Sequence, residues 1–455
     1  MRDHAAVLTS CFVALGAASL IALSNSQKPF YYDSSVYWIL QYSFFKHGQF
    51  SLLNFTSPLR GYLLPLIYYA LREVSDAVSL SPSHAVKLFN VLMFALIGAV
   101  LAPRLAEITW PRFRWGIGRR LALTALLLAF WSGYLEFPLS DFPALAMALL
   151  ALIAVDRSDS LVWTLLAGVA CGVAIDMRPQ YLPLALILLL FVIVPRLARR
   201  ESAARSLKQI LPRFASLAIG LVLISLPQSL SAHRHFHTWS FVPGAAAHLS
   251  SLQLTEGLRL QRYETYVGLG HGPRMEYRDE AGSRLLAKQK DGHVASVGQY
   301  LGLIASHPVT MAPLFVRHLV NGFDQRYTTP YVGHLDTGSH RWLRLGGFLL
   351  VFLALLRIFW SGARRSIAPS RWRYPIALAA CAVTSVPSAV ETRYMLPVWL
   401  LVFVLALLPA WPNPVGAGTG VTRYRSVVGL AFSYLLFTAA MFYIASNASS
   451  HLHLV

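Results

Sequence analysis

The sequence has few charged residues, and acids are fewer than bases. Asp, Glu, Lys and Arg make up only 13% of its 455 residues, whereas a soluble domain carries about 25%. Hydrophobic residues make up 56%, and the shortage of charge extends along the whole chain. The apolar runs are roughly 17–25 residues long, the length that crosses a ~30 Å hydrocarbon core as a helix. The sequence therefore excludes a soluble globular protein and predicts an all-α polytopic membrane protein.

Features of several other functional classes are also missing. There is no Gly-rich phosphate loop and no alternation of strands with helices, which excludes a nucleotide-binding domain of that kind. The three cysteines, Cys11, Cys171 and Cys381, lie in apolar runs and are interpreted as small buried hydrophobic residues. The net charge of +19 is concentrated in short loops and forms no basic stripe interleaved with aromatics. Nucleic-acid binding is therefore excluded.

Apolar stretches along the chain predict about 11 transmembrane helices, two of them short. They lie near 5–23, 84–103, 119–135, 142–155, 160–176, 179–195, 214–231, 342–360, 374–390, 395–411 and 426–445. The first is interpreted as a retained span, because no A-x-A-like cleavage site follows it and many further spans do.

The placement of Lys and Arg predicts the orientation of these spans. Basic residues gather in four loops, 104–120, 196–213, 357–373 and 423–425, whereas the short connection 136–141 has none. The positive-inside rule places the four basic loops and the N-terminus in the cytoplasm. Arg-rich and Ala/Leu-rich usage is typical of bacteria, so we expect a multi-pass protein of the bacterial inner (plasma) membrane with a periplasmic outer face.

This topology predicts three parts. An N-terminal transmembrane module, 1–230, includes a long first outer loop, 24–83; a small mixed outer domain follows at 231–341, and C-terminal spans at 342–455. Within the first outer loop, the apolar stretch 59–71 is short for a span, and we expect a helix lying in or dipping into the membrane interface.

Charged residues occur at the outer ends of several predicted spans. Such groups are costly at membrane depth and usually serve a function. They are two acids and three arginines: Asp33, Asp141, Arg60, Arg178 and Arg393. Their convergence on one face would suit an anionic ligand together with a proton acceptor, because Arg donates paired hydrogen bonds to phosphate and a carboxylate accepts a proton.

Structural interpretations of the same residues stay open. Asp33 and Asp141 both fit helix N-caps, and the arginines fit anchors at the lipid headgroups. The three histidines of HRHFH, 233–237, fit either a metal site or contact with phosphate headgroups. The sequence names no certain cofactor and leaves a divalent cation as an alternative.

Five segments, taken in order, resemble the GT-C glycosyltransferases over about residues 1–411. They are the first outer loop with its early Asp, then EFPLSDFPALAMALLALIAV, AGVACGVAIDMRPQYLPLAL, YLGLIASHPVTMAPLFVRHL and ETRYMLPVWLL. Within this group, the five segments most resemble those of the protein O-mannosyltransferases and lipid A aminoarabinose transferases. The resemblance implies inverting transfer of a hexose or pentose from a polyprenyl-phosphate donor to a hydroxyl of a lipid, glycan or protein acceptor.

The resemblance also implies roles for individual residues. Asp33 matches the catalytic base of the first outer loop, and Asp141 matches a second acid at the next outer turn. The residues implied at the lipid phosphate are Arg60, Arg178, Arg393 and Tyr394. Many relatives carry two adjacent acids at the first site, whereas Ser34 follows Asp33 here, and this departure weakens the case for a shared-acid or strong metal-binding role.

The main alternative from another class is a transporter or flippase for a phosphate-bearing lipid. Inverted-repeat transporters have matched halves with sites near the bilayer midplane. No such halves are visible here, and the charged set lies toward one surface. A related lipid-linked polymer ligase or polymerase is a second alternative, and a purely structural scaffold leaves the two outer acids unexplained.

Overall fold

The computed structural model describes residues 2–24, 28–197, 203–268, 274–289, 292–334, 341–359, 371–408, 420–449 and 452–454. Parts of two predicted cytoplasmic loops, 198–202 and 360–370, therefore lie outside the described residues, as does the end of the predicted span 395–411. The chain divides into two compact units, residues 1–250 with 373–384 and residues 251–372 with 385–455. These units are defined by packing contacts. The predicted division into parts 1–230, 231–341 and 342–455 therefore stays a prediction.

In its described residues, the first unit has one short hairpin, and its other regular elements are helices. Its α-helices are α1 (Arg2–Ser24), α2 (Tyr32–Ile39), α3 (Leu63–Ala77), α4 (Pro82–Ala95), α5 (Ala102–Thr109), α6 (Ile117–Trp131), α7 (Asp141–Val155), α8 (Leu161–Met177), α9 (Leu182–Leu197), α10 (Ala203–Phe236) and α17 (Arg373–Val383). A π-helical segment, η3 (Leu96–Leu101), joins α4 to α5, and a 3-10 turn, η4 (Ser132–Glu136), follows α6.

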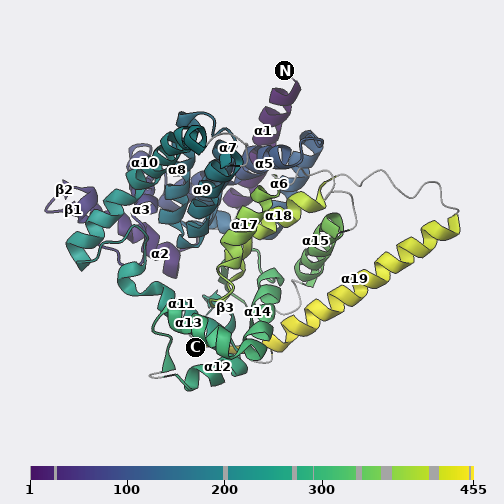
Figure 1. Ribbon diagram of the computed structural model, residues 1–455. Coiled ribbons are helices and arrows are strands. Elements are labelled where there is room, and N and C mark those ends of the chain that lie inside the picture. The colour runs from purple at the N-terminus through teal and green to yellow at the C-terminus, as the bar shows by residue number, and fades with distance from the viewer. Residues whose placement is uncertain are drawn as a thin grey trace. The chain divides into compact units, whose positions relative to one another are not determined.

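Helix α7 lies at the centre of the first unit. It is apolar all round after Asp141, and nearly all its residues are buried, as expected for a helix without a polar face. Helix α8 packs beside it and against α10 (Figure 1). A Cβ on Gly168 of α8 would collide with the Leu217 carbonyl oxygen of α10, so glycine permits this close approach. Helix α8 is therefore packed closely between α7 and α10.

The helices agree with the predicted spans in position. Each of the eleven predicted stretches overlaps a helix. Among the described residues, five helices are long and apolar enough to cross a membrane: Ala5–Ser24, Pro82–Thr109, Pro179–Leu197, Ser206–Phe236 and Arg341–Phe359. Five more apolar helices are shorter: Asp141–Val155, Leu161–Met177, Arg373–Val383, Thr392–Ala406 and Gly429–Ala445. The mainly helical class with membrane-length helices is confirmed, and the count of eleven spans stays a prediction.

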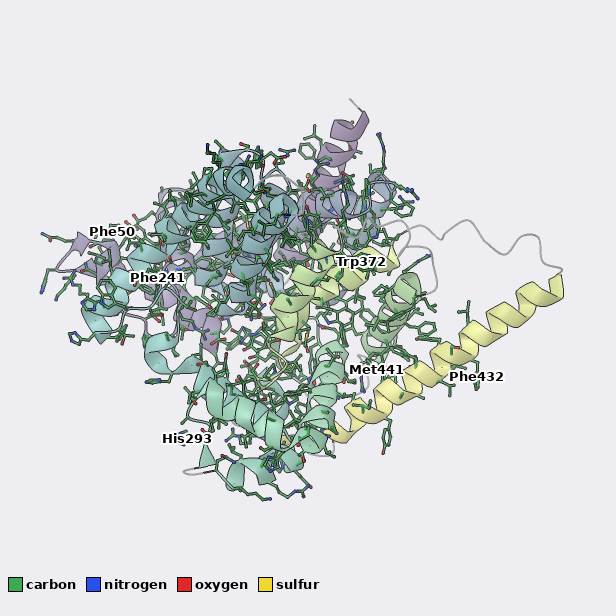
Figure 2. The ribbon with its side chains drawn as sticks, viewed as in Figure 1. Phe50, Phe241, His293, Trp372, Phe432 and Met441 are labelled. Atoms are coloured by element: carbon green, nitrogen blue, oxygen red, sulfur yellow. The ribbon has the colours of Figure 1, made fainter. Side chains whose placement is uncertain are left out.

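The first outer loop contains helix α2, a two-stranded hairpin and helix α3. Strands β1 (Phe45–Lys46) and β2 (Gln49–Phe50) pair antiparallel, and Phe50, labelled in Figure 2, stacks on Tyr69 of α3 with ring centroids 5.5 Å apart. The helix predicted over 59–71 is present as α3 and begins at Leu63. The packed core of the loop is formed by the buried side chains of Phe44, Phe55 and Tyr62.

The second unit combines a small sheet with helices. Its helices are α11 (Leu249–Arg259, which begins in the first unit), α12 (Glu280–Ala287), α13 (Val297–Ser306), α14 (Pro308–Phe323), α15 (Arg341–Phe359), α18 (Leu396–Ala406) and α19 (Gly420–Ser449). Strands β3 (Leu260–Tyr266), β4 (Arg274–Arg278), β5 (Tyr331–Val332) and β6 (Leu452–Leu454) form a sheet in the order β5-β3-β4-β6. On α19, Met441 is buried against α14 and α15 whereas Phe432 is exposed; Figure 2 labels both.

Asp324, just after α14, is the centre of a buried ion cluster in the second unit. Its carboxylate lies 2.6 Å from Nε of Arg326, 2.6 Å from Nε of Arg344 and 3.5 Å from Nη1 of Arg262. Burial alone would raise the pKa of Asp324, but Arg326, Arg262 and Arg344 outweigh it and hold the pKa below its ordinary value. The carboxylate is therefore ionised in the folded protein.

Asp324→Asn is expected to destabilise the protein at neutral pH, because it removes the carboxylate charge shared by Arg326, Arg344 and Arg262, at a cost of roughly 3–5 kcal/mol. A carboxylate with a depressed folded-state pKa stabilises above its unfolded pKa, and this stabilisation is lost as the pH falls through the folded pKa. The melting temperature in detergent should therefore drop for the variant at pH 7, and the difference from wild type should shrink below about pH 4. An equal difference at both pH values would contradict this account.

Candidate active site

Four of the predicted site residues form two ion pairs in the first unit. Arg60 Nη2 lies 2.5 Å from Asp33 Oδ1, and Arg178 Nη1 donates to Asp141 Oδ1. The two pairs are linked by Tyr37 and Ser140: the Arg60 guanidinium carbon lies 5.1 Å from the centre of the Tyr37 ring, and the Tyr37 hydroxyl lies 3.4 Å from Oγ of Ser140. Of the five charged residues expected to converge, these four thus lie together in the first unit, and the convergence of all five on one face of the membrane stays a prediction.

Asp33 lies in the first turn of α2 and not at its N-cap. The helix begins at Tyr32, and the cap contacts are made by Ser34, whose Oγ accepts from the Tyr31 N–H at 2.9 Å and donates to the Tyr31 carbonyl at 2.6 Å. Tyr32 has a φ of 39°, in the left-handed region that bulky residues seldom adopt. Such strain occurs preferentially at functional sites. Ser34 has a structural task here, because its hydroxyl makes both cap contacts with Tyr31.

Asp141 is the first residue of α7, where a negative charge interacts favourably with the helix dipole. Its partner Arg178 directly follows α8, which ends at Met177 because Arg178 precedes Pro179 and takes an extended conformation. Both side chains are buried: Asp141 is 2% exposed and Arg178 10% exposed. The pair therefore joins the ends of two central helices in the interior.

The two pairs differ in accessibility. The side chains of Asp33 and Arg60 are each 28% exposed, whereas the Asp141–Arg178 pair is almost fully enclosed. Asp33 is thus partly accessible from solvent, whereas Asp141 is enclosed by the protein. This difference favours Asp33, the acid that the sequence resemblance matches to the base.

Two further acids near these pairs were not singled out from the sequence. Asp176, two residues before Arg178, is 3% exposed, and its Oδ2 accepts from the backbone N–H of Leu63 at 2.9 Å. Glu136 forms an ion pair of 2.7 Å with Lys28, in the turn that precedes Asp141. The available signal was the same as for Asp141, namely an acid next to an apolar run.

Arg393 and Tyr394 belong to the second unit, in the 3-10 turn η9 (Thr392–Met395) that precedes α18. Arg393 is 8% exposed, and its Nη2 donates to Oε1 of Glu391 at 3.1 Å. The hydroxyl of Tyr394 donates to the same oxygen at 3.0 Å. Glu391, another acid that sequence reasoning passed over, thus orders the Arg-Tyr pair. The shared site of Arg393 with Asp33 stays a prediction.

The histidines of HRHFH make separate contacts in the first unit. Nε2 of His235 lies 2.9 Å from the carbonyl oxygen of Leu53, and the ring of His233 stacks on Trp239 with centroids 4.2 Å apart. Across the part of the chain that the structure describes, no group of three or more His, Cys, Asp or Glu side chains is arranged to hold a metal ion.

Comparison with solved structures finds a crystal structure of the Archaeoglobus fulgidus oligosaccharyltransferase tethered with an acceptor peptide containing the NVT sequon. The TM-score is 0.45 at 15% sequence identity, over 97% of this chain and 55% of the other. The chain thus spans about half the length of that structure. No protein-family model and no curated protein matches the chain. At this TM-score and identity, the similarity assigns the chain neither a family nor a function.

Proposed function

We propose that this protein is an integral membrane glycosyltransferase of GT-C type. It moves a sugar from a polyprenyl-phosphate donor to a hydroxyl acceptor on the outer face of the membrane. The observation that carries the proposal is the pairing of a partly exposed acid, Asp33, with a partly exposed arginine, Arg60, beside the buried Asp141–Arg178 pair. An accessible proton acceptor next to an accessible phosphate ligand meets the two chemical demands of this reaction.

In the proposed step, the acceptor oxygen attacks the anomeric carbon of the sugar while the bond from that carbon to the phosphate oxygen breaks. The acceptor proton passes to the Asp33 carboxylate, and the polyprenyl phosphate leaves with the electron pair of the broken bond. Arg60 serves both groups: it orients the carboxylate in the resting state and donates to the phosphate as negative charge accumulates there. No nucleotide is needed, because the donor is a lipid phosphate.

The buried pair is assigned a supporting role. Asp141 and Arg178 fix the ends of α7 and α8, and Ser140, one residue before Asp141, contacts Tyr37 beneath Arg60. A rigid support of this kind keeps a catalytic group in position and so lowers the barrier to reaction. Asp33 is accordingly the base, and Asp141 orders the site.

The cellular test is a comparison of membrane glycolipids and glycoproteins in cells with and without the gene. The proposal predicts that one class of glycoconjugate lacks a single sugar in the deletion strain, and that this sugar returns with the wild-type gene but not with Asp33→Asn. Identical glycolipids and glycoproteins in both strains would count against the proposal.

Arg393 is proposed as a further ligand of the donor phosphate, on the basis of the family resemblance. Arg393→Ala is expected to lose most of the transfer activity, and Arg393→Lys to recover only part, because lysine acts as a point charge and cannot donate two parallel hydrogen bonds. The measurement is donor-dependent kinetics of purified variants. Glu391→Gln is the control, since it keeps an acceptor for Arg393. Unchanged donor affinity and turnover in Arg393→Ala would remove this residue from the site.

The proposed orientation is tested by replacing two exposed lysines, one at a time, with cysteine and labelling the new thiol. Lys208 lies in a predicted cytoplasmic loop and Lys288 in the predicted outer domain, and both are exposed. The background for both variants has Cys11 replaced by Ala, which leaves only the buried Cys171 and Cys381. In intact spheroplasts, Lys208→Cys should be protected from an impermeant maleimide. Lys288→Cys should react with it. Labelling of both from the same side would contradict the topology.

A further inference from the structure

We propose that Asp176 is a positioning residue that holds Arg60 against Asp33. This inference rests on the proposed function and deepens it, because it assigns a task to a buried acid at the end of α8. Asp176 contacts the chain segment that runs from Arg60 into α3.

Asp176 supplies the cap that helix α3 lacks within its own sequence. The N-cap residue of α3, Tyr62, makes no side-chain cap hydrogen bond, and Oδ2 of Asp176 instead accepts from the N–H of Leu63, the first helical residue. A carboxylate at this position also interacts favourably with the helix dipole. The start of α3 is therefore fixed by α8.

Gly61 brings the same segment into direct contact with Asp176. A Cβ at position 61 would collide with the carbonyl oxygen of Asp176 and would also meet its carboxylate. Arg60 immediately precedes this contact, and its backbone N–H is held by Oγ of Ser57 at 3.0 Å. The backbone of Arg60 is thus restrained on both sides, which limits the directions that its guanidinium can take.

The position of Asp176 couples the two ion pairs. On α8, Asp176 holds the segment that carries Arg60, and Arg178, two residues later, holds Asp141. A simple structural role is also a weak explanation for this acid, because Oδ1 is buried and finds no hydrogen-bond partner among the described side chains and backbone. Burial of a partly satisfied carboxylate costs free energy and is typical of functional sites.

The test measures transfer from polyprenyl-phosphate-linked [14C]mannose and from matching donors with other hexoses or pentoses, using purified full-length protein. Asp176→Ala should lower kcat by about 10²-fold, as expected when a reactive group moves by about 1 Å. Asp176→Asn should retain most of the activity, because the amide oxygen still accepts from the Leu63 N–H. The KM for the donor should change by the same factor in Asp176→Ala as in Arg60→Ala. A simple loss of folded protein would leave this KM unchanged.

The decisive measurement is a double-mutant cycle. If Asp176 acts through Arg60, the double variant Arg60→Ala/Asp176→Ala should be no slower than the slower single variant. Gly61→Ala tests the same contact from the other side and replaces Asp176→Ala in the cycle if that protein proves too unstable to purify. Gly168→Ala is the matched control: it also forces a Cβ against a backbone carbonyl of a neighbouring helix, but away from the site, and should lower stability without changing KM.

Two results would overturn the role of Asp176 while leaving the proposed function intact. They are wild-type transfer in Asp176→Ala and losses that multiply in the double variant. Wild-type transfer in Arg60→Ala would remove Arg60 from the proposed step as well as overturning the role of Asp176. A wild-type protein that transfers no sugar from any of these donors would instead overturn the proposed function, and the positioning role with it.

Discussion

Asp33→Asn is expected to lower sugar transfer by roughly 10²–10⁴-fold, the usual contribution of a general base. The amide keeps the size of the side chain and can still accept a hydrogen bond from Arg60, but it cannot take the proton of the acceptor hydroxyl. Because the cap contacts at the start of α2 are made by Ser34, the substitution should leave folding and donor binding close to wild type. Purified variants are compared by initial rates and melting temperature.

The matched control for Asp33→Asn is Ser34→Ala. This variant removes both cap hydrogen bonds to Tyr31 and should cost about 1 kcal/mol of stability, yet it keeps the carboxylate and should keep transfer. The opposite pattern, an active Asp33→Asn and an inactive Ser34→Ala, would show that the helix start and not the carboxylate matters, and Asp141 would then become the leading candidate for the base.

Removal of Arg178 alone is expected to destabilise the protein strongly. Arg178→Met leaves the buried Asp141 carboxylate without its partner, which should cost roughly 3–5 kcal/mol and abolish activity with it. Replacing both residues, as Asp141→Leu/Arg178→Met, removes the unpaired charge and should restore the melting temperature, since apolar residues of similar volume often replace a buried pair without loss.

The double variant then distinguishes a supporting role of Asp141 from a role as the catalytic base. If the pair only orders the site, the double variant, with its stability restored, should regain a measurable part of the transfer activity. Its activity should have the pH dependence of the wild type. If Asp141 is itself the base, transfer should stay absent although the protein is as stable as the wild type. The measurement is turnover per folded molecule, with folded protein quantified by its melting transition.

Much of the fold could be predicted from the sequence because a long apolar run that crosses a membrane folds as a helix. The backbone must satisfy its hydrogen bonds internally there, and a helix does so. Asp33, Asp141, Arg60 and Arg178 stood out for the same reason, since each interrupts or borders an apolar run. The existence of these candidate residues was therefore visible without any structure.

The partners of these residues could not be predicted, because each pairing depends on how distant segments meet. Arg60 pairs with Asp33 of α2, and the neighbouring Gly61 packs against Asp176 at the end of α8. Asp176 lies two residues from Arg178 in the sequence, but its contact is with Leu63. The capping alternative for Asp33 was wrong: the periodicity of the sequence does not reveal that α2 begins at Tyr32, two residues earlier than a cap at Asp33 would imply, or that Ser34 makes the cap contacts.

The central claim is tested most directly with purified protein reconstituted in lipid vesicles. The vesicles contain polyprenyl-phosphate donors with 14C-labelled hexoses or pentoses, and envelope material from the deletion strain supplies the acceptor. The account predicts that label leaves the lipid and becomes covalently attached to an acceptor hydroxyl with wild-type protein, and not with Asp33→Asn. Donor lipid that crosses the vesicle membrane with its sugar still attached would contradict the account and identify a lipid transporter.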